Sequence, residues 1–392
     1  MIIGINTLSA QGGGGINDFE NLLPFIQIID KKNNYIIFYT KSQKELIAII
    51  PNEFKKVEIN YIPSNRYLRG PTRIIWEQFV FPLYILLHRV DVLYSVGNTT
   101  SILAPCKIVL YIGNANPYSL HYIKWPLNYR IQSLVLKWLG WLSTKRADKV
   151  RFASKNTMKL LSKHFNLPAD KGVVIYNGLN ENFKNALLKN DFESIHQQKY
   201  ILSVGLIYIH KNYHRLLKAF QILIDKYNYE GDLVIIGSYF FDDYFENLNY
   251  LVKSLGLQGK VFFKGKVLNK DIIRYYKFAD LLVQPSISES FGIPLIEAMT
   301  VGIPIVASDC EMEEKYQGIC FNPFREVCDN AASYCNPFDP NDITESIYKV
   351  ISDIKYSKQL VINGKLRSKH FEVINTVRGI YCLLENVTSK KK

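Results

Sequence analysis

The sequence predicts an α/β fold in which two doubly wound parallel sheets follow one another along the chain. Short apolar stretches alternate with longer amphipathic ones over the 392 residues, as expected for parallel strands covered by helices on both faces. The alternation restarts after residues 176–180, whose Asn-Gly pair predicts a turn. A chain of this length also suits two domains with separate cores. We therefore expect a first domain at 1–178, a second at 179–375, and a C-terminal helix or tail at 376–392 that can pack back on the first.

Each expected element is an apolar or amphipathic stretch bounded by polar or turn residues. In the first half the strands are expected at 1–8, 35–39, 57–62, 90–95, 107–112, 150–153 and 173–175, and the helices at 16–29, 74–87 and 127–144. In the second half the strands are expected at 200–204, 233–236, 261–263, 281–284 and 304–307, and the helices at 213–227, 241–255, 269–278 and 293–300. Ligands of such sheets bind at the carboxyl ends of the strands.

The composition narrows the class of protein. Hydrophobic residues make up 48% of the chain, which indicates a globular protein. The six cysteines include no C-x-x-C pair and no His at zinc spacing, so we expect reduced thiols in a cytosolic protein and no metal site. The short, uncharged start at 1–5 predicts a strand rather than a signal peptide. No apolar stretch approaches the roughly 20 residues needed to span a bilayer.

The net charge of +13 is unevenly distributed. Between residues 118 and 171, eleven Lys or Arg and two Asp give a net charge of +9, and this basic window also holds Trp125, Trp138 and Trp141. Basic residues interleaved with Trp and Leu favour peripheral contact with an anionic membrane. The alternative is a solvated helical face over an ordinary core. No nucleic-acid-binding motif accompanies the charge, so no nucleic-acid partner is expected.

Two glutamates separated by seven residues form the most informative motif, residues 289–297. Pro294 predicts a helix start, which leaves Glu289 in the preceding loop and Glu297 at the N-terminal end of the helix. Amides at such an end favour an anion, and carboxylates accept hydrogen bonds from sugar or ribose hydroxyls. This combination predicts a nucleotide-sugar site.

A second candidate follows the first strand of the second half. Gly205 ends that strand and Lys211 precedes the next helix, where an ammonium group can neutralise a diphosphate with help from helix amides and from His210 or Arg215. An ordinary surface lysine is the alternative. Gly237 and Gly265 end the next two strands, where a nucleobase can stack; turn glycines are the alternative there.

Two candidates lie in the first half. The glycines at 12–15 follow the first strand and allow backbone amides to approach a phosphate, although Asn17 breaks the G-x-G-x-x-G pattern and a plain flexible turn is the alternative. Asn114 follows the strand at 107–112, where its amide can bind an acceptor or donor hydroxyl. An Asx-turn before Pro117 explains this residue equally well.

With these residues in place, the chain resembles the glycosyltransferases of GT-B architecture, group 1 or family 4, over nearly its whole length. The resemblance is carried by 285–299 followed by 302–308, by 175–180, and by Ala153-Ser154 with Thr157, Lys211-Asn212 and Trp76-Glu77-Gln78. It implies two Rossmann-like domains that face a central cleft, with the acceptor on the first and the nucleotide sugar on the second.

The resemblance also implies roles for individual residues. Glu289 would contact the donor sugar and Glu297 the ribose, while Lys211 would neutralise the diphosphate. It also implies that Gly14, Gly15, Ser290, Phe291 and Gly292 bind the donor. Together with the residues singled out above, the expected donor-binding set further includes Gly205, Gly237 and Gly265, and the expected acceptor-side residues are Gly13 and Asn114. It implies transfer with retention, with no metal, no cofactor and no protein nucleophile.

Two departures from the family pattern affect these roles. Relatives often carry Arg where this chain has Leu206, or Arg before the lysine where this chain has His210. Relatives also often have His at the position of Asn114, and an Asn side chain cannot act as a base.

The expected protein is thus a cytosolic, membrane-associated retaining hexosyltransferase. It would move a sugar from a GDP- or UDP-linked donor to a growing, lipid-linked glycan in bacterial surface polysaccharide biosynthesis. The alternatives are a non-catalytic nucleotide-sugar-binding scaffold subunit, another GT-B enzyme such as an epimerase or a phosphorylase, and a dinucleotide-dependent oxidoreductase. The last is disfavoured because both glycine loops lack the dinucleotide fingerprint.

Overall fold

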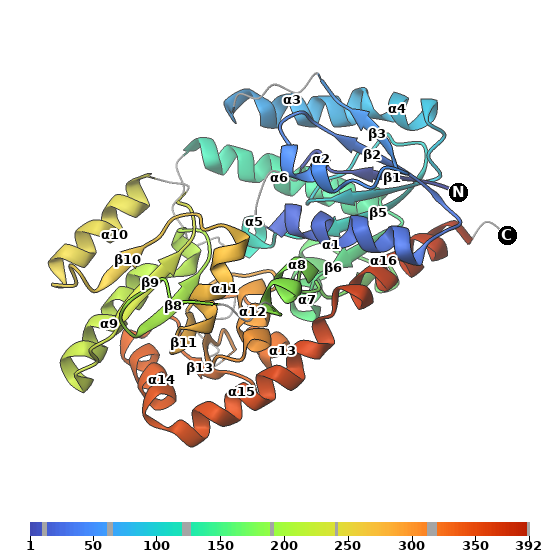
Figure 1. The fold of residues 1–392 in the computed structure, drawn as a ribbon. Coiled ribbons are helices and arrows are strands. Elements are labelled where there is room, and N and C mark those ends of the chain that lie inside the picture. The colour runs from blue at the N-terminus through green and yellow to red at the C-terminus, as the bar shows by residue number, and fades with distance from the viewer. Residues whose placement is uncertain are drawn as a thin grey trace. The chain divides into compact units, whose positions relative to one another are not determined.

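The chain divides into two compact units. A computed structural model describes residues 1–9, 14–60, 66–119, 127–188, 192–239, 242–311 and 320–389 (Figure 1). The first unit is Met1–Asn180 together with Val373–Lys392, and the second is Glu181–Glu372. The boundaries lie at Asn180 and Glu372, a few residues from those expected at 178 and 375.

The first unit contains a seven-stranded parallel sheet. Its strands are β1 (Ile2–Asn6), β2 (Asn34–Tyr39), β3 (Lys55–Glu58), β4 (Val92–Val96), β5 (Lys107–Ile112), β6 (Lys149–Phe152) and β7 (Gly172–Val174), in the order β3-β2-β1-β4-β5-β6-β7. Strand β4 is buried along its whole length, and β1 and β5 along nearly all of theirs. This burial on both faces explains why these strands are almost continuously apolar.

Eight helices among the described residues belong to the first unit. They are α1 (Gly14–Ile29), α2 (Lys44–Ile49), α3 (Arg66–Phe79), α4 (Phe81–Leu87), α5 (Asn116–Ser119), α6 (Leu127–Arg146), α7 (Lys155–Phe165) and α16 (Val373–Ser389). Helix α16, red in Figure 1, packs against α1, β4 and β5. The single helix expected at 74–87 is wrong: it is two helices, α3 and α4. Pro82 stands in the first turn of α4, and its missing N–H prevents a continuous helix there.

The second unit contains a six-stranded parallel sheet. Its strands are β8 (Tyr200–Val204), β9 (Asp232–Ile236), β10 (Val261–Phe263), β11 (Leu281–Gln284), β12 (Ile305–Ser308) and β13 (Ser333–Cys335), in the order β10-β9-β8-β11-β12-β13. Its α-helices are α8 (Glu181–Leu187), α9 (Tyr213–Tyr227), α10 (Asp242–Ser254), α11 (Asn269–Lys277), α12 (Ile293–Val301), α13 (Phe324–Cys328), α14 (Pro340–Ser352) and α15 (Ile354–Ser368), with 3-10 turns η1 (Ile209–Lys211) and η3 (Lys369–Phe371). The strand order reverses between β8 and β11, so the loops after these two strands diverge from a shared point.

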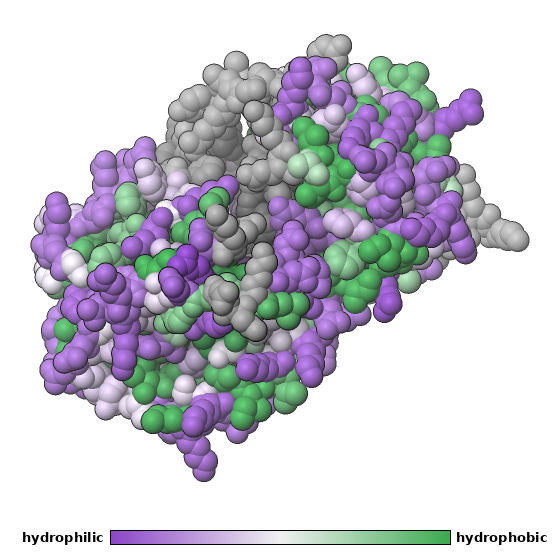
Figure 2. Space-filling view, in the orientation of Figure 1, coloured by the Kyte–Doolittle hydropathy of each residue, from purple (hydrophilic) through white to green (hydrophobic). Residues whose placement is uncertain are grey.

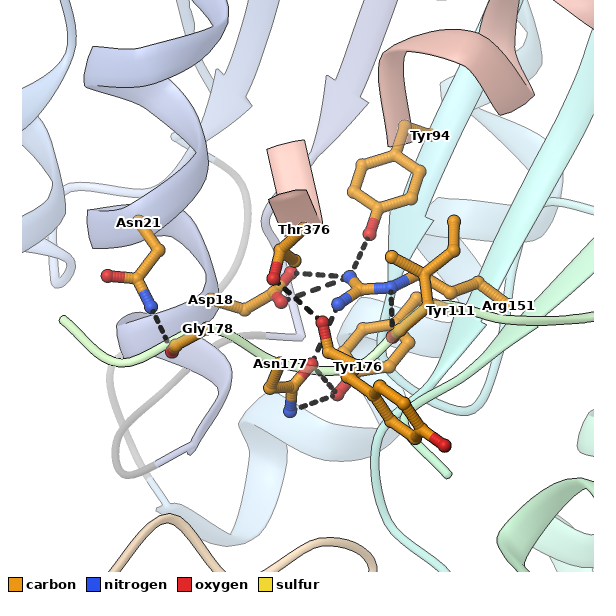
Figure 3. Close-up of polar contacts among 10 residues, drawn as sticks. Asp18, Asn21, Tyr94, Tyr111, Arg151, Tyr176, Asn177, Gly178 and Thr376 are labelled. Carbon is orange, nitrogen blue, oxygen red and sulfur yellow. Dashed lines mark hydrogen bonds and ion pairs between the residues drawn. The ribbon is translucent and has the colours of Figure 1, made fainter. Parts of the chain in front are cut away.

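A buried arginine holds together several parts of the first unit (Figure 3). The Arg151 guanidinium donates to the Asp18 carboxylate at 3.0 Å, to the Tyr94 hydroxyl at 2.6 Å and to Asn177 Oδ1 at 2.7 Å. It also lies 4.1 Å from the centroid of the Tyr111 ring. Although burial opposes the charge, Asp18 raises the pKa of Arg151, which keeps the guanidinium charged.

The segment that leaves the first unit is fixed by further hydrogen bonds in the same region. Asn21 Nδ2 donates to the Gly178 carbonyl at 3.0 Å, and the Thr376 hydroxyl donates to the Tyr176 carbonyl at 2.7 Å. Helices α1 and α16 therefore both hold the stretch around 176–178, which the sequence marks only as a turn.

One expectation about the cysteines is wrong. Cys310 and Cys320 form a disulfide, whereas the sequence predicts six reduced thiols. These residues are ten apart and carry none of the spacing signals of a disulfide framework, so only their proximity in the fold reveals the pair. Cys328 and Cys335 are free and buried, as expected for packed thiols, and Cys382 is free and exposed.

The basic window does not form one charged surface. Arg151 is completely buried, so its assignment to a solvated or membrane-facing group is wrong. On α6, in contrast, Leu134, Trp138 and Trp141 are 65%, 60% and 41% exposed. On the face shown in Figure 2, green hydrophobic residues form small groups among purple hydrophilic ones. Across the described ranges, no helix is both long and apolar enough to cross a membrane.

Candidate functional site

The strand reversal in the second unit brings two predicted site segments together. The loop after β8 carries Lys211, and the loop after β11 carries Glu289. Asn212, which is completely buried, joins these loops because its Nδ2 donates to the Pro285 carbonyl at 3.0 Å and to the Pro337 carbonyl at 2.6 Å. The Ile287 N–H also donates to the His210 carbonyl at 2.8 Å. These bonds fix the loops to one another, so their side chains form one site.

Lys211 and Glu289 form an ion pair at this junction. The ammonium group of Lys211 donates to Glu289 Oε1, and the Ser286 hydroxyl donates to the same oxygen at 3.2 Å. The two side chains are 11% and 15% exposed, so the pair is accessible to a ligand. Burial by itself would raise the pKa of Glu289, but the Lys211 ammonium outweighs it and the pKa is lowered. The Glu289 carboxylate is therefore charged at neutral pH.

Three predicted glycines lie in a row at the ends of adjacent strands. The Gly205 N–H donates to the Ile236 carbonyl at 2.9 Å, and the Gly237 N–H donates to the Gly265 carbonyl at 2.9 Å. A Cβ added to Gly237 would collide with the Gly205 carbonyl, so only glycine permits this close approach. A Cβ on Gly205 would lie 3.1 Å from Lys211 Nζ, which places the ammonium group directly over this strand end.

The N-terminus of α12 follows Glu289 within a few residues. Gly292 precedes the helix with a φ of +105°, and a Cβ there would lie 2.8 Å from the Phe324 ring, so the turn requires glycine. Phe291 is buried and packs edge-on against Phe371, with ring centroids 5.7 Å apart. Ser290 is half-buried. The predicted residues of this turn thus lead directly into a helix N-terminus, which favours an anion.

Glu297 lies in the second turn of α12. Its carboxylate Oε2 accepts a hydrogen bond of 2.6 Å from the Tyr276 hydroxyl on α11. Burial raises the pKa of this carboxyl to about 7, although the tyrosine hydrogen bond opposes the rise. The residue as a whole is only half-buried, so a ligand can reach it.

His210 and Arg215, which could replace the arginine found in many relatives, are not placed as Lys211 is. His210 is 6% exposed. Burial and, to a lesser extent, the charge of the adjacent Lys211 lower the pKa of its ring to about 3, so the ring is neutral at neutral pH. Arg215 donates to Asn212 Oδ1 at 2.9 Å and lies 5.2 Å from the Phe338 ring centroid. Lys211 is the cation that the structure places against Glu289.

The candidates of the first unit are described only in part. Gly13 lies outside the described residues, and Gly14 and Gly15 are the first two residues of α1. Asn114 is exposed, and its Oδ1 accepts a hydrogen bond of 3.0 Å from the Asn116 N–H. This hydrogen bond forms an Asx-turn, which is the alternative to a binding role for Asn114.

Sequence reasoning missed Asn212, Tyr276 and Phe324 as supports of the site. Asn212 adopts a φ of +66°, a backbone conformation that Asn adopts more readily than most residues. Its position between a turn and a helix is the local signal that could have indicated its structural role. Tyr276 and Phe324 carry no comparable signal, because their contacts depend on how α11, α12 and α13 pack. In the part of the chain that the structure describes, no group of three His, Cys, Asp or Glu side chains is arranged to hold a metal ion.

Comparison with known proteins is consistent with this geometry. Residues 36–183 match the family model described as Glycosyltransferase Family 4, and residues 185–367 match that described as Glycosyl transferases group 1. An O-antigen chain mannosyltransferase of Salmonella typhimurium is 32% identical over 221 residues, which cover 56% of this chain and 56% of that protein. The aligned part thus spans little more than half of this relative.

Solved structures resemble the whole chain. Sucrose-phosphate synthase from Thermosynechococcus elongatus has a TM-score of 0.73 at 16% identity, with 99% of each chain covered. HepE from Anabaena, solved in complex with UDP and glucose, has a TM-score of 0.69 at 18% identity, with 98% of this chain and 100% of HepE covered. At these identities the likeness concerns the fold, and it confirms the expected pair of Rossmann-like domains.

Proposed function

Because this chain belongs to the group 1 glycosyltransferases of the GT-B fold, we propose that it transfers a sugar from a nucleoside diphosphate sugar to a growing glycan. The observation that carries the proposal is the Lys211–Glu289 ion pair beside Gly205 and ahead of the α12 N-terminus. A cation, a helix N-terminus and a carboxylate at one strand-end junction suit a ligand that has both phosphates and hydroxyls.

In the proposed complex, different residues of the second unit bind different parts of the donor. Lys211 Nζ has three donors, so it can hold Glu289 and a diphosphate oxygen together. Glu289 then accepts hydrogen bonds from hydroxyls of the donor sugar, and Glu297 accepts them from the ribose. The strand end at Gly265, where a Cβ would meet no atom within 4 Å, leaves room for the base beside Gly237.

In the proposed reaction an acceptor hydroxyl oxygen bonds to the anomeric carbon while the bond from that carbon to the diphosphate breaks. The leaving diphosphate takes the proton of the acceptor, and the configuration is retained. Negative charge grows on the diphosphate during this step, and Lys211 with the α12 amides stabilises it.

The donor and acceptor classes are proposed from the relatives. The Salmonella relative is an O-antigen chain mannosyltransferase, and HepE binds UDP with glucose, so mannosyl and glucosyl donors are the first to test. A lipid-linked glycan of a bacterial surface polysaccharide is the proposed acceptor.

The test measures both binding and transfer. A thermal-shift screen against GDP- and UDP-linked sugars should identify the donor, and labelled donor should then pass its sugar to a lipid-linked acceptor. Glu297→Gln should weaken donor binding and lower turnover sharply. Wild-type activity in this variant would count against the site. Donor binding without transfer or hydrolysis would favour a non-catalytic binding subunit instead.

Contact with a membrane is part of the proposal and is supported by α6. Leu134, Trp138 and Lys145 are exposed on this helix, and Lys145 Nζ lies 6.0 Å from the centroid of the Trp141 ring. Exposed Trp and Leu with adjacent lysines suit the interface of an anionic bilayer.

Sedimentation with anionic liposomes tests the membrane contact. Changing Leu134, Trp138 and Lys145 together to Ser should reduce the bound fraction. The matched control changes Ile354, Lys358 and Ile362 on α15, which are likewise exposed, to Ser. Equal sedimentation of both variants would refute the contact through α6.

A further inference from the structure

Glu297 is held by a neighbouring helix as well as by its own. Tyr276 lies on α11, and its hydroxyl donates to Glu297 Oε2 at 2.6 Å. Within the described part of the chain, the Glu297 carboxylate makes its hydrogen bond through Oε2 alone. The tyrosine therefore fixes one carboxylate oxygen and leaves the acceptor sites of the other for a ligand.

Tyr276 is itself rigid. Its side chain is completely buried, and its ring packs edge-on against Phe183 of α8, with centroids 5.9 Å apart. Burial raises the pKa of its hydroxyl well above the ordinary value, so the group remains a proton donor at neutral pH. A buried and fixed donor holds an acceptor in one place better than a mobile surface group can.

Burial and the Tyr276 hydroxyl are the two influences on the pKa of the Glu297 carboxyl, so the tyrosine hydroxyl is the titratable group that faces this carboxylate. Tyr213 is the other titratable group that interacts with Tyr276. Several charged side chains on the helices packed against α12 have other partners: Lys184 with Glu372, Asp271 with Arg274, Arg325 with Asp309, Lys277 with the Phe192 ring, and Arg367 with the Glu326 and Val327 carbonyls.

We propose that Tyr276 is a positioning residue for the donor nucleotide, because its hydroxyl orients the Glu297 carboxylate toward the ribose. The inference rests on the proposed function, in which Glu297 binds the ribose. A hydrogen bond from tyrosine favours the charged carboxylate over the protonated one, and the charged carboxylate is the better acceptor for two adjacent hydroxyls.

The test is the affinity for UDP and for GDP, measured by calorimetry on the full chain across the pH range on both sides of neutrality. Tyr276→Phe removes only the hydroxyl and keeps the ring against Phe183. It should weaken nucleotide binding about fivefold to tenfold at neutral pH. It should also move the midpoint of the pH dependence to a higher pH, because the ionised carboxylate has lost a donor.

Two controls separate the possible outcomes. Tyr275→Phe changes the adjacent tyrosine on α11. The backbone carbonyl of Tyr275 accepts a hydrogen bond from the Tyr200 hydroxyl, and the substitution leaves this carbonyl in place. The variant should therefore bind the nucleotide as the wild type does. Glu297→Gln should weaken binding and remove the pH dependence. A wild-type pH profile in Tyr276→Phe, together with weakened binding in Glu297→Gln, overturns the role of Tyr276 alone. Wild-type binding in Glu297→Gln overturns the ribose assignment itself.

A thermal melt checks that Tyr276→Phe is folded. If it is not, Phe183→Leu provides a second variant, because it loosens the ring and retains the hydroxyl. This variant should also weaken nucleotide binding and move the midpoint of its pH dependence to a higher pH. Unchanged affinity and an unchanged pH profile in Phe183→Leu overturn the proposal.

Discussion

Two ion pairs among the described residues, one in each unit, differ in depth. Arg151 and Asp18 in the first unit have side chains that are 0% and 4% exposed, whereas Lys211 and Glu289 in the second are 11% and 15% exposed. Arg151 is further surrounded by Tyr94, Tyr111 and Asn177. In the deeper pair, protein groups accept the hydrogen bonds of the guanidinium, whereas the shallower pair remains accessible to a ligand.

This difference indicates different roles for pairs with the same kind of charges. A buried pair pays a large desolvation cost and supports stability only while both partners are present. A partly open pair retains binding capacity, which is what a site for phosphates and hydroxyls requires. The sequence marks Lys211 as a candidate site residue and Arg151 as one basic residue of a charged window, but it does not show how deeply either pair is buried.

The largest effect should come from breaking the deep pair. Arg151→Met leaves Asp18 buried without its cation and should lower the free energy of unfolding by about 3–5 kcal/mol in urea titrations. Arg151→Met combined with Asp18→Leu should restore most of this loss, because no unpaired charge remains. Equal losses in the single and double variants would show that the charges themselves are not the cause.

Breaking the open pair should instead affect turnover. Lys211→Met should lower turnover with the identified donor roughly 10²–10³-fold, since charge on the leaving diphosphate loses its stabiliser. Its unfolding free energy should change less than that of Arg151→Met. Lys218→Met, an exposed lysine on α9, is the control and should retain full activity. A Lys211 variant that is inactive only because it is unfolded would remove the distinction between the two pairs.

The support beneath the open pair can be tested at Gly237. Gly237→Ala places a Cβ against the Gly205 carbonyl and should cost about 2 kcal/mol of unfolding free energy. Because Gly205 lies under Lys211, donor affinity should fall as well. Gly256→Ala is a useful comparison, since Gly256 also has a positive φ but has open space around its Cβ position. Donor binding should be unaffected by that change.

The smallest expected effect is on the pH dependence of stability, through the carboxyl group of Glu297. Its pKa is about 7 in the folded protein against an ordinary value of 4.5, so the folded state binds the proton more tightly than the unfolded state does. Stability should therefore decrease as the pH rises from about 4.5 to about 7. Glu297→Gln should remove this decrease and gain about 1 kcal/mol above neutrality, less than the full shift implies because the residue is partly exposed. Thermal melts at several pH values measure the difference.

Much of the fold was predictable from periodicity. The strands that hold the site, β8, β9, β10, β11 and β12, lie within a residue or so of their expected positions, because buried parallel strands are short and almost wholly apolar. The Glu289–Glu297 motif was also predictable, since Pro294 marks the helix start. The break between α3 and α4 was missed although Pro82 is visible in the sequence.

The rest depended on contacts between distant segments. Tyr276 and Glu297 lie on separate helices whose mutual rotation no local pattern specifies. Arg151 on β6 and Asp18 on α1 are likewise brought together only by the packing of distant segments. The Cys310–Cys320 disulfide likewise arises from proximity. The roles of Gly14, Gly15 and Asn114 in donor or acceptor binding stay predictions, as does transfer with retention.

Helix α16 has a consequence for how the chain is made. The ribosome completes β1 to β7 first, but Val377, Ile380 and Leu384, which are 0%, 1% and 0% exposed on the helix that covers α1, β4 and β5, are synthesised only after the entire second unit. The second unit is continuous in sequence and can fold as it emerges. The half of the protein that is translated first is therefore the half that matures last, and during that interval its uncovered apolar surface is a natural substrate for chaperones.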